Sequence, residues 1–144
     1  MQLVARRYPH EVQGLVLVDS THPLQLKGAG SPEHWPTWVR VVLSMATSAV
    51  VKEEFTAIDS TGEEILGLPT FGNKPMIILS ASRPMKGTSA LAKDGNEKRK
   101  DLARLYPDAR QIWVDSDHGI PLEDPGSVIM AIREVLSQPQ PSMP

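Results

Sequence analysis

The chain has 144 residues, the length of one domain, and a chain of this length can bury a self-sufficient core. Its 15 Lys and Arg against 17 Asp and Glu leave a net charge of −2, which argues against nucleic acid and anionic membranes as partners. It has no cysteine, which excludes disulfides and thiolate chemistry, and no apolar run approaches the roughly 20 residues of a membrane span.

The first residues predict the end of a helix followed by a buried strand. Residues 2–8 combine apolar side chains with two arginines that suit a helix C-terminus, and Pro9 prevents the helix from continuing. This start lacks the apolar core of a signal peptide, so we expect a cytoplasmic protein. Residues 14–18 form a continuous apolar run, typical of parallel strands buried on both faces, and polar residues from Asp19 onward end it.

The stretch 24–73 has a different character and predicts a helical, cap-like insertion. Residues 38–51 are apolar enough for a buried or interface helix, and residues 52–58 and 61–66 are typical of short amphipathic helices. Glycines and prolines before this part predict a loose loop. We interpret the whole stretch as an insertion into one domain rather than as a second domain.

Two further strands follow the insertion. Residues 76–80 are apolar and end in a serine-rich turn, and residues 111–115 contain a second short apolar run. Between them, residues 86–100 pass from a polar loop into a helix that ends before Pro107. Alternation of strands with helices predicts an α/β fold with a three-stranded parallel sheet and right-handed crossovers.

The end of the chain predicts a histidine loop between a strand and a strongly signalled helix. His118 follows the third strand, in the setting where binding and catalytic residues often lie. Asp124 suits an N-cap and Pro125 the first helical position. Apolar spacing over residues 128–136 then predicts one helix stripe, and residues 138–144 are expected to be a disordered tail.

Two segments carry a resemblance to a known family. Residues 5–19, ARRYPHEVQGLVLVD, resemble the segment after the nucleophile elbow in α/β-hydrolases of the esterase and haloalkane-dehalogenase kind, and residues 117–125, DHGIPLEDP, resemble that family's histidine loop. The resemblance implies a truncated α/β-hydrolase fold over residues 1–137, the C-terminal part only, with strands six, seven and eight in order. It also implies that His118 is the catalytic base and Asp19, after strand six, its acid.

The nucleophile and the activity are less determined by the sequence. The family's Gly-x-Ser-x-Gly motif does not occur, so Ser80 and Ser82 at the end of the middle strand are candidate replacements, with Ser20 and Ser116 as further options. By resemblance the chain is a serine hydrolase that acts on a small carboxylic ester. The alternatives are a non-catalytic remnant that acts as a dimeric binding module, and a piece of a longer hydrolase that needs its other half.

Ordinary structural roles compete with several of these assignments. Asp19 equally suits a residue that caps the turn after a strand. We expect His22 and His34 to be surface-loop histidines rather than metal ligands, and we expect no metal and no cofactor. Trp35, Trp38 and Met45 resemble the lining of an acyl pocket, although core or interface is the commoner role of such residues.

The resemblance also leads to an expectation about assembly. In the family, strand six pairs with the strand that leads into the nucleophile elbow, and no such strand is recognisable in this chain. We therefore expect an open edge along Leu15–Val18, with Leu3, Val4, Leu15 and Leu17 partly bare. A homodimer would cover this edge, either by antiparallel pairing of the two strands or by exchange of helices.

Overall fold

The sheet is the centre of the molecule. The computed structural model describes residues 1–46, 48–83, 85–86 and 89–138, so nearly all of the tail predicted over 138–144 lies outside the described residues. Three parallel strands pair in the order β1-β2-β3, with bounds Leu15–Val18 for β1, Met76–Ala81 for β2 and Arg110–Val114 for β3. The predicted α/β class and the three-stranded parallel sheet are confirmed.

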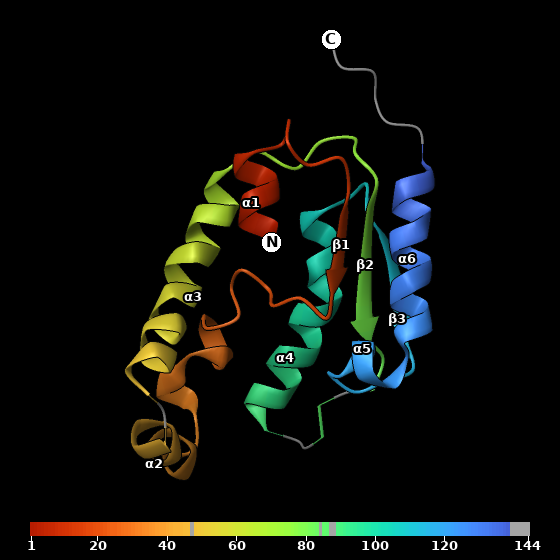
Figure 1. The fold of residues 1–144 in the computed structure, drawn as a ribbon. Helices are drawn as coiled ribbons and strands as arrows, with labels where there is room; N and C mark the ends of the chain where they lie inside the picture. Colours follow the sequence, from red (N-terminus) through yellow and green to blue (C-terminus); the bar gives the residue numbers. More distant parts are fainter. Residues whose placement is uncertain (47, 84, 87–88, 139–144) are drawn as a thin grey trace.

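Helices flank the sheet on both sides (Figure 1). They are α1 (Gln2–Arg7), α2 (Thr37–Ala46), α3 (Ala49–Gly67), α4 (Ala90–Asp101), α5 (Ile120–Glu123) and α6 (Pro125–Ser137), with short 3-10 turns at Gly28–Gly30, Pro32–His34 and Leu102–Leu105. The predicted cap of α6 is confirmed, since Ser127 N donates to Asp124 Oδ1 at 3.1 Å, and the bonds from Ser127 lower the pKa of that carboxyl. No described helix has the length and apolar character to cross a bilayer.

Strand β2 is buried along its whole length, which explains its unbroken apolar sequence. Its residues alternate between two apolar clusters. Met76 and Ile78 pack with residues of α1 and of the turn after α4, whereas Ile77 and Leu79 pack with residues of α5 and α6. The sheet is therefore a middle layer, with α1 and α4 on one side and α6 on the other (Figure 1).

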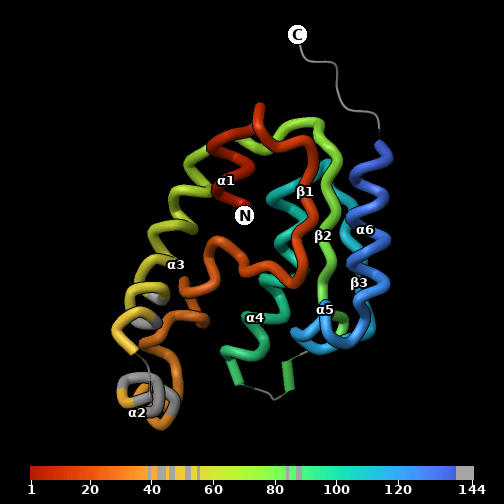
Figure 2. Tube along the Cα trace, viewed as in Figure 1, coloured from red at the N-terminus to blue at the C-terminus, as the bar shows by residue number. Residues whose placement is uncertain are grey.

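The helical insertion differs from the prediction. Two helices, α2 and α3, replace the three that the sequence predicts. Figure 2 shows that α3 ends beside α1, whereas α2 lies away from the sheet. Helix α3 continues through the boundary expected near residue 60, because no proline interrupts it and Gly62 fits against the chain after β1. A Cβ added at Gly62 would lie 1.9 Å from Pro23 O. Trp38 and Met45 on α2 are exposed rather than part of the core.

The side chains of β1 also differ from the prediction. Leu15 and Leu17 are 7% and 3% exposed, because α1 and Phe71 cover them, so the expectation that they are partly bare is wrong. The backbone edge is open among the described residues, since β1 pairs only with β2. Peptide N–H groups at Leu15 and Asp19 donate toward β2, so in a parallel ladder those of Val16 and Val18 point away from it.

A buried arginine connects α1 to the ends of two other elements. Arg6 is 6% exposed, and its Nη1 donates to Ile65 O at 2.9 Å and Leu68 O at 3.2 Å. Its Nη2 donates to Leu105 O at 3.2 Å, and its guanidinium lies 4.8 Å from the centroid of the Tyr106 ring. Carbonyls at a helix C-terminus carry partial negative charge, so this cation stabilises the attachment of α3 although no carboxylate of the described residues pairs with it.

We expect Arg6→Met to lower the free energy of unfolding by about 2–4 kcal/mol, because it leaves buried carbonyls without donors. The matched control is Arg7→Met, which removes an ion pair of half-exposed side chains with Glu64 and should cost under about 1 kcal/mol. Urea denaturation followed by circular dichroism measures both. Equal losses in the two variants would contradict the bridging role of Arg6.

Candidate active site

The candidate site lies where the three strands end. Parallel strands bring their carboxyl ends to one edge of the sheet, and ligands bind at that edge in α/β proteins. Asp19 follows β1, Ser82 follows β2, and the loop that carries His118 follows β3. The topology thus brings together residues that are up to 99 positions apart in the chain.

Asp19 has a backbone conformation that is uncommon for a residue with a side chain. Its φ is 42°, in the left-handed region, which Asp tolerates better than most residues. Its N–H donates to Leu79 O at 2.8 Å, and its Oδ1 lies 3.5 Å from Ala81 N. The carboxylate is only 10% exposed. It lies next to the C-terminal end of β2, the central strand.

The backbone around His118 is fixed on both sides. Ser116 and Ile120 are fully buried, and the N–H groups of Ser82 and Arg83 donate to Val114 O and Ser116 O. The ring itself is 65% exposed. The loop therefore holds a solvent-accessible imidazole on an anchored main chain, as the sequence predicts for this position.

Two contacts define the state of the imidazole. His118 Nδ1 lies 2.5 Å from Asp19 Oδ2, and Arg99 Nη2 lies 3.0 Å from His118 Nε2. An ionised carboxylate and a guanidinium can only accept and only donate, respectively, so these contacts assign the proton to Nδ1 and leave Nε2 as the acceptor. A general base requires this tautomer. Its basic nitrogen, Nε2, accepts a hydrogen bond from Arg99.

Arg99 is the site residue that sequence reasoning missed. The run 98–100 reads as a solvated helix face, but Arg99 Nη1 donates to Ala81 O at 3.1 Å and Arg83 O at 3.0 Å. The signal that could have identified Arg99 is its helical spacing from buried residues. Arg99 lies four residues after Gly95 and three before Leu102, and both of these are buried.

The candidate serines lie in different environments. Ser80 is 1% exposed, and its Oγ accepts a hydrogen bond from Gln111 Nε2 at 2.9 Å. Ser82 is exposed. Within the described part of the chain, the polar contacts of the His118 ring are those to Asp19 and Arg99, so neither serine hydroxyl is paired with the base.

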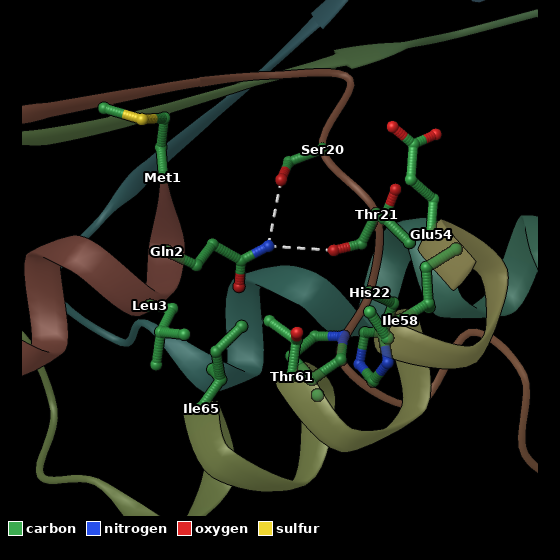
Figure 3. A pocket seen from close by; sticks show the side chains of 13 residues that line it. Met1, Gln2, Leu3, Ser20, Thr21, His22, Glu54, Ile58, Thr61 and Ile65 are labelled. Atoms are coloured by element: carbon green, nitrogen blue, oxygen red, sulfur yellow. Dashed lines mark hydrogen bonds between the residues drawn. The ribbon is translucent and has the colours of Figure 1, made fainter. Parts of the chain in front are cut away.

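Two cavities adjoin the loop after β1. One has a volume of about 220 Å³ and is lined by Asp19, Ser20, Thr21, His22, Gln25, Met85, Gly95, Lys98, Arg99 and His118. The other, of about 370 Å³, lies between that loop, the start of α1 and α3 (Figure 3). There the Gln2 amide donates to Ser20 Oγ at 2.9 Å and Thr21 O at 2.8 Å. Ser20 lines both cavities, so among the described residues it is a serine that shares a cavity with His118.

A second histidine lies between the same two cavities. His22 is 3% exposed, so the expectation of a surface histidine is wrong for it, whereas His34 is exposed. His22 Nδ1 accepts a hydrogen bond from Leu24 N at 3.0 Å, and Nε2 lies 3.3 Å from Asp101 Oδ2. Burial lowers the pKa of His22 more than the Asp101 charge raises it, which favours the neutral ring.

Neither a metal site in the described residues nor a similar known protein gives further information on the function. Over residues 1–46, 48–83, 85–86 and 89–138, no group of three His, Asp or Glu side chains is arranged to hold a metal ion. Comparison of the chain with family models, curated proteins and solved structures found no match. Functional inference therefore depends on the His118 pair, on Arg99 and on the cavities beside them.

We expect the burial of His22 to make stability pH-dependent. Its pKa in the folded chain is below the ordinary 6.5, so between those two pKa values the unfolded chain binds a proton that the folded chain does not. The free energy of unfolding should be highest above 6.5 and should fall by up to about 1.4 kcal/mol per pH unit as the pH decreases.

His22→Asn tests this expectation, because its Oδ1 can still accept the Leu24 N–H but cannot titrate. Urea denaturation of both proteins at several pH values between about 7.5 and 5.5 gives the two slopes. The slope should be smaller in the variant. Identical slopes would show that another group causes the pH dependence.

Proposed function

We propose that this chain is a carboxylic-ester hydrolase of the α/β-hydrolase type, with His118 as general base and Asp19 as the acid that orients it. The observation that carries the proposal is the 2.5 Å contact between His118 Nδ1 and Asp19 Oδ2. The strand order β1-β2-β3 supports it, since strands six to eight of that family have the same order and direction. The base and acid also lie beside a cavity.

The proposed reaction is acyl transfer through a serine. The serine Oγ attacks the ester carbonyl carbon while its proton moves to His118 Nε2, and the C–O bond to the alcohol breaks as that proton moves to the leaving oxygen. Water then attacks the acyl-serine with His118 again accepting the proton, which releases the acid and restores the serine. Asp19 keeps the proton on Nδ1 throughout, and Arg99 must release Nε2 for the first step.

Three serines are candidate nucleophiles under this proposal. Ser82 and Ser80 are the two that the sequence singles out, and Ser20 joins them because it lines the same cavity as His118. The burial of Ser80 disfavours it as a nucleophile. Reaction of the purified chain with a fluorophosphonate, followed by peptide mass spectrometry, identifies the activated hydroxyl, and serine-to-alanine variants check the assignment.

We expect His118→Ala to lower the hydrolysis of a short-chain activated ester by about 10²–10⁴-fold, the usual cost of losing a general base. Asp19→Asn should also lower it, and should remove the downfield NMR resonance of the Nδ1 proton shared with the carboxylate. His34→Ala is the matched control, because His34 is exposed on another loop. Unchanged turnover in His118→Ala would mean that the activity does not use this histidine.

A second candidate function is a non-catalytic module that assembles as a homodimer. Two observations favour it: Arg99 lies on the nitrogen that catalysis would need, and β1 has an open backbone edge within the described chain. Two copies related by a two-fold axis would pair their β1 strands in antiparallel fashion. Unpaired N–H groups at Val16 and Val18 would then find acceptors in the second copy.

Under the dimer proposal, we expect light scattering at micromolar concentration to give twice the chain mass of 15.8 kDa. Val16→Pro removes an outward-facing donor and part of the packing of the Val16 side chain against the cluster with α6. Proline is tolerated on edge strands, so this variant should be a folded monomer of somewhat lower stability. Circular dichroism checks its fold. A wild-type mass of 15.8 kDa would rule out the dimer.

A further inference from the structure

Arg99 differs from its basic neighbours in what balances its charge. Lys98 Nζ lies 2.7 Å from Asp94 Oδ2, and Arg83 Nε lies 3.1 Å from Asp115 Oδ1. The contacts of the Arg99 guanidinium within the described chain are to two carbonyl oxygens and one neutral imidazole nitrogen. Its charge therefore has no carboxylate partner there, although the side chain is partly buried.

The Arg99 guanidinium borders three cavities in the described part of the chain. Arg99, His118 and Met85 line both the cavity of about 220 Å³ and one of about 470 Å³. Arg99 also lines a cavity of about 440 Å³ that does not reach His118. Ser20 and Thr21 also line the smallest of these cavities, and their side chains carry neutral hydroxyl groups that can donate hydrogen bonds. The surroundings of the guanidinium can thus hold a small polar ligand beside the imidazole.

We propose that Arg99 is an anion-binding subsite and that the ligand is a small ester that carries a carboxylate, which rests on the hydrolase function proposed above. A guanidinium binds a carboxylate through charge-assisted, often bidentate hydrogen bonds, and these are stronger than a bond to a neutral imidazole. A substrate carboxylate would therefore take Nη2 from His118. That exchange frees Nε2, so the ligand itself exposes the base.

Two features favour a carboxylate over a phosphate group. Asp19 lines the same cavity, and its negative charge repels a dianion more strongly than a monoanion. Arg99 Nη1 already holds two carbonyls, so Nη2 and Nε are left for a planar group with two oxygens. The 220 Å³ volume is below the usual range for drug-sized ligands, which indicates a short acid.

The test compares two esters that differ in one charge. Monomethyl succinate carries a carboxylate, and dimethyl succinate replaces it with a neutral methyl ester of similar shape. We expect the wild-type chain to bind the monoester about ten- to a hundredfold more tightly, the usual effect of hydrogen bonds to a charged group. In wild type, only the monoester should shift the ¹⁵N resonance of His118 Nε2, since only it removes Arg99 from that nitrogen. Hydrolysis of the diester would produce the monoester, so the diester is measured before any methanol is released.

Variants assign the preference to Arg99. Arg99→Met should abolish it and Arg99→Lys should keep part of it, because lysine retains the charge without the planar fork. Arg110→Met is the matched control, since Arg110 is exposed on β3 and pairs with Glu134. Equal binding of both esters by wild type, no shift of His118, or a preference that survives in Arg99→Met would each overturn the proposal. The wild-type comparison decides it even if Arg99→Met does not fold.

The same titrations separate this proposal from the hydrolase function. Inorganic phosphate serves as a third ligand, and binding as tight as that of the monoester would overturn the carboxylate assignment. A monoester preference without release of methanol would support the anion subsite and contradict the hydrolase. Release of methanol from both esters at equal rates and affinities would support the hydrolase and contradict the subsite.

Discussion

Burial of β2 on both faces is the constraint on which the site depends. The strands next to it, β1 and β3, are about 10 Å apart, twice the spacing of neighbouring strands, so their loops meet only across the end of β2. Asp19 reaches that position through its left-handed backbone, and His118 reaches it from an anchored loop. Arg99 donates to Ala81 O, the last carbonyl of the strand. The end of β2, a rigid element, therefore fixes the positions of all three side chains.

Much of this arrangement is predictable from the sequence, because it depends on local signals. Apolar runs ended by polar residues indicate the strands, Asp124 and Pro125 indicate the start of α6, and parallel direction brings Asp19 and His118 to one edge. Arg99 is not predictable in the same way. Its role depends on which face of α4 meets the loops after β2 and β3. Helical spacing from Gly95 and Leu102 indicates that Arg99 shares their face, but it does not indicate which loops that face meets.

Two His–Asp pairs with opposite environments lie within the described residues. His118 is exposed while its partner Asp19 is nearly buried, whereas His22 is buried beside a carboxylate, Asp101, that is partly exposed. An exposed ring with a buried acid can exchange protons with a ligand and still keep its orientation. A buried ring that accepts a hydrogen bond from a backbone N–H, as His22 does, holds a loop in place instead. The residue types of a His–Asp pair therefore do not distinguish a catalytic role from a structural one.

The contact between Gly62 and Pro23 has a consequence for the cavity of about 370 Å³ beside it. At this contact the backbone of α3 lies directly against the backbone of the loop after β1, with no side chain between them. Both residues line the cavity. The separation of α3 from the loop after β1 is thus set by backbone thickness. Substitutions at Glu54, Ile58 or Thr61 can change the polarity of this cavity without moving its backbone. Any residue larger than glycine at position 62 would instead displace α3 from the loop after β1.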